Sequence, residues 1–196
     1  MWLLVGLGNP GPRYARNRHN AGFMVLDELC RRAGASAPRL KLGAELSEAT
    51  LAGERVLFCK PMEYMNLSGQ AVQRAAAFWK IQPEHAVVVH DEMDVPFGRL
   101  KLGSGGGTGG HNGLASIVQE WGSQNFARVR FGISRPPANW DTADYVLADF
   151  AEDERRQLPD LIGEAADATM AIVKNGLPIA MNRFNKRKKK ETEAGA

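Results

Sequence analysis

The amino-acid sequence predicts the α/β fold class, with a single three-layer α/β/α domain in which a twisted mixed β-sheet is flanked by helices. Short apolar runs typical of buried strands, such as 2–7 and 86–89, alternate with longer stretches of helical periodicity. Two further runs, 46–51 and 55–59, are joined by three residues, which predicts a hairpin and therefore some antiparallel pairing. The 196 residues, 44% of them hydrophobic, are enough for one core, so we expect one domain over 1–185.

The first helix is expected over 20–33. Phe23, Leu26 and Leu29 recur there at helical spacing, which predicts one apolar face turned towards the sheet. Gly34 follows the last periodic residue, and glycine is favoured just past a helix end because it adopts the left-handed conformation without strain. The chain between the first strand and this helix is therefore a loop.

The remaining elements follow from local signals. A second helix is expected over 70–80, and Asn66 or Ser68 is expected to cap it, which is also the ordinary structural role of Asn66. The later elements are a strand at 99–102, a helix at 114–121, a strand at 128–133, and two or three helices within 142–184 with Pro159 and Pro178 near their starts. The basic tail, 186–196, is expected to be disordered.

The loop after the first strand contains an apparent dinucleotide-binding motif. Gly6, Gly8 and Gly11 spell G-x-G-x-x-G after an N-terminal strand. In that motif the third glycine lies in the first turn of a helix, but Pro10 and Pro12 flank Gly11 and the helical pattern starts later. No acid stands at the end of a second strand to bind the ribose. We therefore reject a dinucleotide site and expect no cofactor.

The formal net charge of +3 is unevenly distributed along the chain. Residues 1–140 carry 16 bases and 11 acids, whereas 141–167 carry two bases and nine acids, and the tail carries five bases and two acids. This segregation suggests that a polyanion binds the first part while the acidic part faces away, although acidic helix faces are more often simply solvated.

Cysteine usage and hydropathy predict a cytoplasmic protein. Cys30 and Cys59 are far apart and form no C-x-x-C pair, so buried free thiols are expected rather than disulfides or thiolate metal ligands. No apolar run approaches the roughly 20 residues that span a bilayer, and the apolar first residues lack the flanks of a signal peptide. We expect no membrane partner.

His19 is the expected centre of the chemistry. It lies in the loop after the first strand, and ligands of open α/β sheets bind outside the carboxyl ends of strands. A lone histidine is more often structural or merely exposed, so this role requires partners elsewhere in the chain. Asp91, just after the strand at 86–89, is the natural partner. The glycine-rich loop at 103–113 would allow another molecule to approach the backbone closely, but it is no Walker A loop because His111 and Asn112 stand where Lys-Ser/Thr must follow.

Three long motifs together resemble the bacterial-type peptidyl-tRNA hydrolases. They are V-G-L-G-N-P-G-x-x-Y-x-x-x-R-H-N-x-G at 5–22, K-P-x-x-Y-M-N-x-S-G at 60–69, and H-D-E-x-D-x-P-x-G with G-G-H-N-G within 90–113. R-V-R-F-G-I at 128–133 adds a weaker match, and the resemblance covers the chain from Val5 to about Asn185. It implies hydrolysis of the ester between a peptide and the 3′-terminal ribose of tRNA, which releases peptidyl-tRNA dropped by ribosomes.

The resemblance also implies a role for each site residue. His19 would be the general base on water and Asp91 would orient its imidazole, and no G-x-S-x-G elbow offers a serine nucleophile. Asn9 would contact the first peptide unit, which free aminoacyl-tRNA lacks. The substrate-binding residues implied are Asn9, Tyr14, Tyr64, Met65, Asn66, His111 and Asn112. Instead of binding substrate, Met65 could simply fill the core. His111 could likewise be a buried neutral histidine without contact to tRNA.

The tRNA itself would be bound mainly through its phosphates. Arg99, Lys101 and Arg130 match basic positions of the family. Many relatives carry a further base where this chain has Gly103-Ser104, and other departures from the family pattern are Asn17 and Glu63, where threonine is usual. Glu63 is expected to place a negative charge beside the pocket.

Two other classes of function remain open from the sequence. A metallohydrolase could use His19, His90, Asp91, Asp94 and His111 as ligands, although no H-E-x-x-H or C-x-x-C spacing is present, and we expect no metal. A non-catalytic RNA-binding protein on the same fold is favoured by the basic tail and the glycine-rich loop, but it leaves the His/Asp pair unexplained. We expect a monomer with peptidyl-tRNA as its partner.

Overall fold

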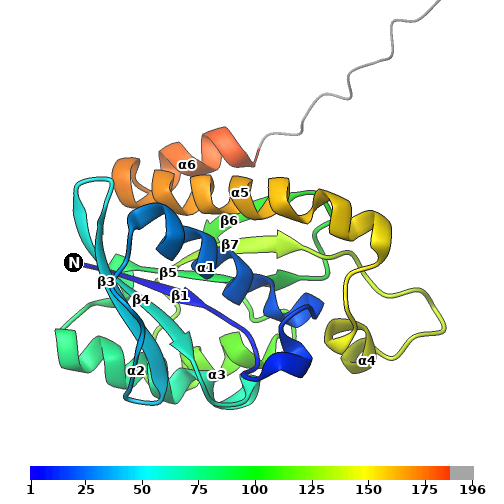
Figure 1. Cartoon of the computed structure of the whole chain (residues 1–196), viewed down its shortest axis with the longest axis horizontal. Coiled ribbons are helices and arrows are strands. Elements are labelled where there is room, and N and C mark those ends of the chain that lie inside the picture. Colours follow the sequence, from blue (N-terminus) through cyan, green and yellow to red (C-terminus); the bar gives the residue numbers. More distant parts are fainter. Residues whose placement is uncertain (186–196) are drawn as a thin grey trace, which may run out of the picture.

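The computed structural model describes residues 1–185 and contains one seven-stranded mixed sheet (Figure 1). The strand order is β2-β3-β4-β1-β5-β7-β6. β4, β1, β5 and β7 are parallel, while β2, β3 and β6 pair antiparallel to their neighbours. The strands are β1 Trp2–Gly6, β2 Arg39–Lys41, β3 Ala44–Leu51, β4 Glu54–Pro61, β5 Ala86–Glu92, β6 Leu100–Ser104 and β7 Ala127–Gly132. The mixed sheet confirms the predicted α/β class.

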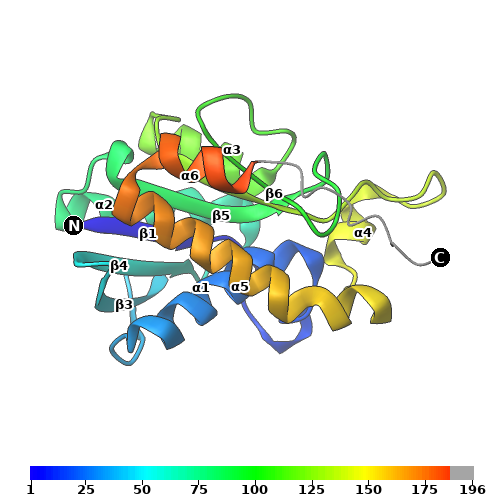
Figure 2. The ribbon, with the colours of Figure 1, turned by 90° about the horizontal axis from the view of Figure 1, so that it is seen from above.

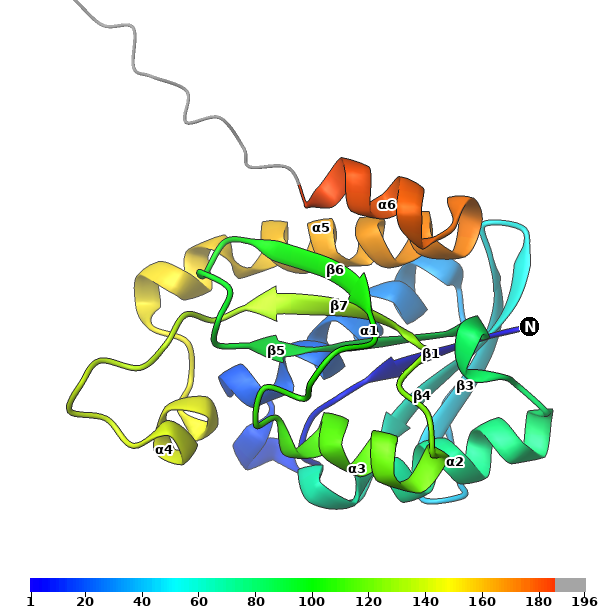
Figure 3. The same cartoon turned by 180° about the vertical axis from the view of Figure 1, so that it is seen from behind.

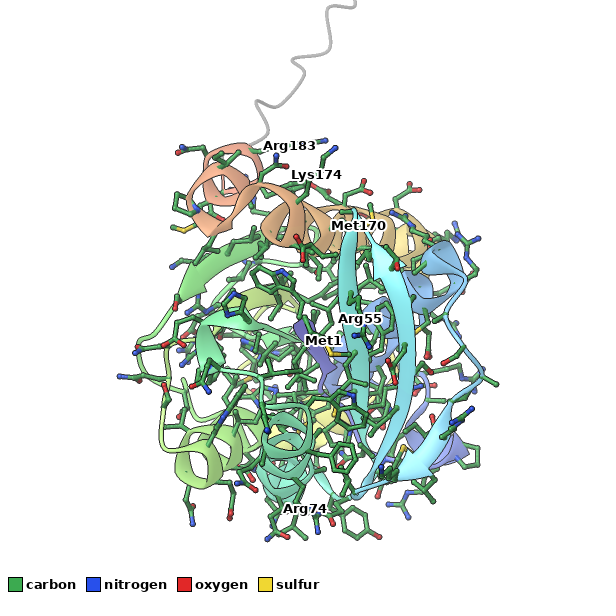
Figure 4. All side chains as sticks on the ribbon, turned by 90° about the vertical axis from the view of Figure 1, so that its left-hand side faces the viewer. Met1, Arg55, Arg74, Met170, Lys174 and Arg183 are labelled. Atoms are coloured by element: carbon green, nitrogen blue, oxygen red, sulfur yellow. The ribbon has the colours of Figure 1, made fainter. Side chains whose placement is uncertain are left out.

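Helices cover both faces of the sheet. The helices are α1 Ala21–Ala33, α2 Ser68–Trp79, α3 Asn112–Trp121, α4 Thr142–Leu147, α5 Glu152–Asn175 and α6 Leu177–Phe184. α1, α5 and α6 lie on one face, and α2 and α3 on the other (Figures 1 and 3). Seen from the side, Lys174 and Arg183 mark the first layer and Arg74 the second (Figure 4). α4 lies beyond the sheet, at the same end as the chain that follows β1 (Figures 1 and 2).

Alternating side chains of the strands build two separate apolar clusters. In β1, Leu4 packs in the cluster under α1 and α5, whereas Leu3 and Val5 pack in the cluster under α2 and α3. All three side chains are fully buried, and each contributes about 1.5–3 kcal/mol relative to an exposed position. β1 therefore packs against helices on both faces of the sheet, and this buried strand fixes the start of the loop that follows it.

Two glycines bring α1 close to the sheet. A Cβ at Gly22 would collide with the carbonyl of Val89 in β5, and one at Gly6 would collide with the carbonyl of Gly22. Gly6 thus serves helix packing, although it is also the first glycine of the apparent dinucleotide motif. The residues after Gly11 form a 3-10 turn, Pro12–Tyr14, rather than the start of an α-helix. The close approach places the turn before α1 directly beside β5.

Most predicted elements are present, with shifted ends. The first helix ends at Gly34, which has the expected left-handed conformation (φ 56°). The hairpin is longer than predicted, and the strand predicted at 86–89 continues to Glu92, so Asp91 lies inside β5. The short edge strand β2 was not predicted. Its three residues are all exposed, so no alternation of apolar residues marks it.

The predicted cap of the second helix is wrong. Leu67 is the N-cap of α2 and makes no side-chain hydrogen bond, while Asn66 belongs to the preceding 3-10 turn, Met65–Leu67. Ser68 is already the first helical residue, and its hydroxyl is buried without a partner in the part of the chain that the structure describes. The 3-10 turn shifts Asn66 away from the helix end, which leaves its amide free for another role.

Proline placement in the last third was predicted correctly only once. Pro178 lies in the first turn of α6, but Pro159 lies well inside α5. Proline lacks the N–H that would bond to the carbonyl four residues earlier, that of Arg155, and this stretch of α5 is exposed enough for water to bind that carbonyl. The expected disorder of 186–196 concerns residues outside the described range. Within that range no helix is both long enough and apolar enough to cross a bilayer.

Candidate active site

The site forms at the carboxyl ends of the parallel strands of the sheet. The chain after β1 carries Asn9 and His19, the chain after β4 carries Tyr64 and Asn66, and β5 carries Asp91 near its end. The glycine-rich loop starts at the opposite end of the sheet, because β6 runs antiparallel to β7. The loop crosses back before α3, whose start brings His111 and Asn112 to the site.

One carboxylate oxygen joins two histidines. His19 Nδ1 lies 2.9 Å from Asp91 Oδ1, and His111 Nε2 lies 3.0 Å from the same oxygen. His19 and Asp91 are 8% and 3% exposed, and the centroids of the two imidazole rings are 4.8 Å apart. The predicted pair of His19 and Asp91 is thus brought together, with His111 as an additional member.

The hydrogen bonds assign the protons of this centre. His111 is the N-cap of α3, where its Nδ1 accepts the backbone N–H groups of Gly113 and Leu114, so its Nε2 carries the proton that Asp91 accepts. The carboxylate likewise accepts a hydrogen bond from His19 Nδ1–H. In its neutral form His19 therefore keeps a lone pair on Nε2, which is the arrangement that a general base on water requires.

The electrostatics of the centre favour a charged pair. Burial lowers the pKa of His19, but the charge of Asp91 and its hydrogen bond outweigh burial and raise the pKa above its ordinary value. Burial alone would raise the pKa of Asp91, yet the two neighbouring imidazoles hold that pKa well below the usual range. Asp91 is therefore ionised at neutral pH, and it stabilises the imidazolium that forms when His19 takes a proton.

Asn9 is held by a second asparagine. Asn20 Oδ1 accepts the backbone N–H of Asn9 (2.9 Å), and Asn20 Nδ2 donates to the Asn9 carbonyl (2.9 Å). Asn9 Oδ1 accepts the backbone N–H of Met65, also at 2.9 Å, so the Asn9 side chain joins the first two site loops. Sequence reasoning missed Asn20, although it stands in the same R-H-N stretch as His19. Its amide fixes the backbone of Asn9, which leaves Asn9 Nδ2 to face a ligand.

A cavity of about 840 Å³ opens over this centre. It is large enough for a small-molecule ligand or the end of a larger one. Tyr64, 62% exposed, stands at its rim, and Met65 is buried beneath it. Its lining includes the predicted residues Asn9, Tyr14, His19, Tyr64, Met65, Asn66, Asp91, His111 and Asn112, and also the unpredicted residues Glu92, Met93, Gly109, Gly110, Asp141, Thr142, Ala143, Val146 and Leu147.

The acidic segment does not face away from the site. Asp141 is the N-cap of α4 and lines the cavity, and Asp149 lies 3.4 Å from Arg16 in an ion pair. The expectation was wrong because α4 folds back over the chain after β1, a contact that charge counts along the sequence do not reveal. Glu63 also differs from expectation: it pairs with Arg74 of α2 (2.8 Å) and does not line the cavity.

A buried arginine shapes the glycine-rich loop. Arg128 in β7 is fully buried, and its guanidinium donates to the carbonyls of Gly106 and Gly107 at 3.1 and 2.8 Å. These bonds hold the loop that crosses from β6 to His111. From the sequence, Arg128 is only the first residue of the motif R-V-R-F-G-I. Its structural role could not be predicted, because alternation along a strand does not show which of the two arginines turns inward.

The predicted phosphate-binding residues lie together on β6 and β7. Lys101 is paired in register with Arg130, and Arg99 precedes β6. Lys101 and Arg99 are exposed, whereas Arg130 is partly covered and lies 3.9 Å from Glu92. A Cβ at Gly103 would lie 2.9 Å from the Arg130 guanidinium, so the Arg130 side chain packs directly over the backbone of Gly103.

Only part of the hypothetical metal-ligand set comes together. His19, Asp91 and His111 have ligand atoms within 4.8 Å of one another. His90 instead donates from Nδ1 to the Asp91 carbonyl, and burial together with the nearby His111 lowers the pKa of His90 to about 3. Asp94 pairs with Arg135. Cys30 and Cys59 are free thiols, as predicted, and burial raises the pKa of Cys59 to about 12.

An imidazole hydrogen-bonded to a buried aspartate beside a large cavity lined by amides is an arrangement typical of hydrolases on an α/β scaffold. Comparison with known proteins gives the family. Residues 3–192 match the family model described as peptidyl-tRNA hydrolase, and the chain belongs to that family.

Curated relatives and solved structures agree with this assignment. Peptidyl-tRNA hydrolases of Frankia alni and of an Arthrobacter species are each 50% identical to the chain, covering 94% of it and 93% and 96% of their own lengths. A crystal structure of the Acinetobacter baumannii peptidyl-tRNA hydrolase superposes with a TM-score of 0.89 at 36% identity, over 96% of both chains. The chain is thus an ester hydrolase of peptidyl-tRNA, and the predicted family, fold class and reaction are confirmed.

Proposed function

We propose that His19 is the general base and Asp91 its orienting partner when the chain hydrolyses the ester of peptidyl-tRNA. The observation that carries this proposal is the 2.9 Å contact of His19 Nδ1 with Asp91, which leaves Nε2 free towards the cavity. His19 Nε2 takes a proton from water as the water attacks the ester carbonyl, and Asp91 stabilises the imidazolium. The proton then passes to the departing 3′ oxygen of the tRNA.

The asparagines bind the substrate around the ester in this proposal. Asn66 and Asn112 have exposed side chains at the cavity, and an amide donor there meets the oxyanion without competing for the proton. Asn9 Nδ2 meets the carbonyl of the first peptide unit, which uncharged or free aminoacyl-tRNA lacks. Tyr14, Tyr64 and Met65 form the walls around the 3′ end of the tRNA.

The tRNA phosphates bind to Arg99, Lys101 and Arg130 in the same proposal. These residues form one strip on β6 and its neighbour β7, close to the cavity through Glu92. Lysine and arginine on a surface strip suit phosphate contacts, which position a nucleic acid without reading its sequence. His111, fixed by its three hydrogen bonds, orients Asp91 and does not act as a base.

We further propose that one copy of the chain works alone, in the cytoplasm, as a catalytic domain over 1–185 with a basic tail. All side chains of the His–Asp centre and of the strip come from one chain. The substrate, peptidyl-tRNA left by ribosomes, is found in the cytoplasm. No cofactor is required, because hydrolysis of an activated ester needs only water, a base and an oxyanion donor.

One experiment separates this mechanism from metal-dependent hydrolysis, which the cluster of His19, Asp91 and His111 otherwise permits. The purified protein is assayed on N-acylated aminoacyl-tRNA before and after exhaustive chelation. We expect full activity after chelation, because both histidines are already bound to Asp91 by hydrogen bonds. Activity lost to the chelator and restored by zinc or manganese would contradict the proposal.

A further inference from the structure

Arg18, the residue directly before His19, is buried, and both terminal nitrogens of its guanidinium are hydrogen-bonded. It is 5% exposed, although it comes from a loop with three arginines. Its Nη2 donates to Glu154 Oε2 at 2.6 Å, and its Nη1 donates to the carbonyl of Asp149 at 2.8 Å. The guanidinium also lies 4.4 Å from the centre of the Tyr145 ring. Arg18 is therefore unavailable to tRNA.

These contacts fasten the turn of His19 to the segment between α4 and α5. The backbone N–H of Arg18 donates to the carbonyl of Ala148 at 3.0 Å, and Asn17 donates from Nδ2 to Asp149 Oδ1 at 2.8 Å. Tyr145 in turn donates its hydroxyl to the carbonyl of Ile133, just after β7. We call these contacts of Asn17, Arg18, Tyr145, Asp149 and Glu154 the strap. The strap joins the turn before α1, the end of α4, the start of α5 and the residue that follows β7.

The strap holds two parts of the site at once. On one side Arg18 is covalently next to His19, whose imidazole must stay on Asp91. On the other side α4 contributes a wall of the cavity through Thr142, Val146 and Leu147. Figures 1 and 3 show α4 beside the chain that follows β1, with the start of α5 above it in both views.

We propose that Glu154 is a positioning residue for the hydrolysis, which acts through Arg18 to keep His19 on Asp91 and the α4 wall against the cavity. Their side chains are only 7% and 15% exposed, so the ion pair is largely shielded from water. Removing one partner of such a pair leaves the other charge buried and uncompensated. Arg18 then leaves its place, and both parts of the site loosen together. The inference rests on the proposed role of His19 as the base.

The test compares Glu154→Ala with Glu152→Ala. Both acids lie in the first turn of α5, but within residues 1–185 the only ion pair of Glu152 is with the exposed Arg156. We expect Glu154→Ala to lower kcat by about tenfold to a hundredfold and to raise KM, because small misplacements of catalytic groups have effects of that size. The nuclear magnetic resonance signal of the His19 Nδ1 proton should broaden or shift in this variant. Glu152→Ala should change none of these quantities.

A merely structural strap would give a different result. In that case Glu154→Ala would lower the unfolding temperature but leave kcat, KM and the His19 signal as in the wild type, and the proposal would be overturned. An equal loss in Glu152→Ala would also overturn it, because the effect would then follow from the charge at the start of α5. Glu154→Gln keeps an acceptor for Arg18, so its kcat should recover part of the loss.

Arg18→Lys provides a second route if Glu154→Ala does not fold. Lysine keeps the charge, but its single nitrogen cannot reproduce the planar fork whose two nitrogens bind Glu154 and the Asp149 carbonyl, so kcat should fall. Arg55→Lys, at an exposed position of β4 that pairs with Glu48, is the matched control. His19→Ala is measured in parallel: if it remains active, the proposed base is wrong. If it is inactive while Arg18→Lys behaves as wild type, only the positioning role of Glu154 and Arg18 is wrong.

Discussion

The His19–Asp91 centre and the basic strip of Arg99, Lys101 and Arg130 differ in almost every physical respect. The centre is buried, and its protons are assigned by short hydrogen bonds. In the strip, Arg99 and Lys101 are exposed and their side chains make no ion pair among residues 1–185. A buried group acts through fixed geometry in a low dielectric, whereas exposed charges attract at a distance and are screened by salt. The chemistry and the attraction of tRNA should therefore be separable by mutation.

The largest effect is expected at the base. His19→Ala should lower hydrolysis of N-acylated aminoacyl-tRNA by about 10² or more, the usual contribution of a positioned general base, while tRNA binding survives. His85→Ala is the matched control, because His85 is exposed and lies far from the cavity. If His19→Ala kept more than about a tenth of the wild-type rate, the assignment of the base would be wrong.

A smaller loss is expected from Asp91→Asn, together with a change in pH dependence. His19 works as a base when it is neutral, so the wild-type rate should fall as the pH drops through the His19 pKa, which lies above its ordinary value of 6.5. Removing the negative charge of Asp91 removes the main cause of that increase. The acidic limb of the rate profile should therefore move to lower pH in Asp91→Asn, and the plateau should also be lower.

The profile of kcat against pH checks this prediction. An acidic limb that stays in place in Asp91→Asn would mean that another group titrates there. An unmoved acidic limb would also separate the two roles assigned to Asp91. Orientation of the His19 imidazole could still explain a lower plateau, whereas stabilisation of the His19 imidazolium would require the limb to move.

The sequence predicts the His19–Asp91 pair because both residues follow short apolar strands. β1 and β5 are recognisable from their β-branched and apolar runs, and parallel strands bring their carboxyl ends to one edge. The hydrogen bond of His111 to Asp91 is not predictable in this way. It depends on β6 running antiparallel and on α3 starting at the site, which no local pattern reveals.

Contacts between distant segments are the main part of the site that sequence reasoning missed. Arg18 and Glu154 are 136 residues apart, and each alone reads as an ordinary charged surface residue. The same holds for Asn20, whose pairing with Asn9 depends on how the turn before α1 folds back. Pairing of polar groups in three dimensions decides these roles, and neither periodicity nor capping preference along the chain contains that information.

Mutation of the strip should affect binding and leave the chemistry intact. Lys101→Ala with Arg130→Ala should raise KM for full-length peptidyl-tRNA several-fold, yet leave hydrolysis of a short acylated nucleotide fragment nearly unchanged, because the fragment does not reach the strip. Each lost phosphate contact should also reduce the slope of log binding constant against log salt by about 0.7 to 0.9. Arg55→Ala with Lys174→Ala removes the same charge from β4 and α5 as a control.

Arg130 requires one refinement of that test. It lies 3.9 Å from Glu92, which lines the cavity, so its loss also removes the cation nearest to that carboxylate. Lys101→Ala alone is therefore the cleaner variant for binding. Equal losses on full tRNA and on the fragment in Lys101→Ala would show that the strip shapes the active site, and the comparison between the two regions would fail.

The smallest effect is expected from the basic tail. Residues 186–196 carry five bases and two acids and lie outside the described residues, so only their charge enters the prediction. Deleting them should weaken tRNA binding modestly and flatten its salt dependence, because fewer counterions are released, without changing kcat at saturation. Replacing the five bases of 186–190 by glutamine should reproduce the deletion if charge alone acts. A lower kcat in either variant would show that the tail takes part in positioning the 3′ end of the tRNA over His19, a role that the proposal gives to the residues lining the cavity.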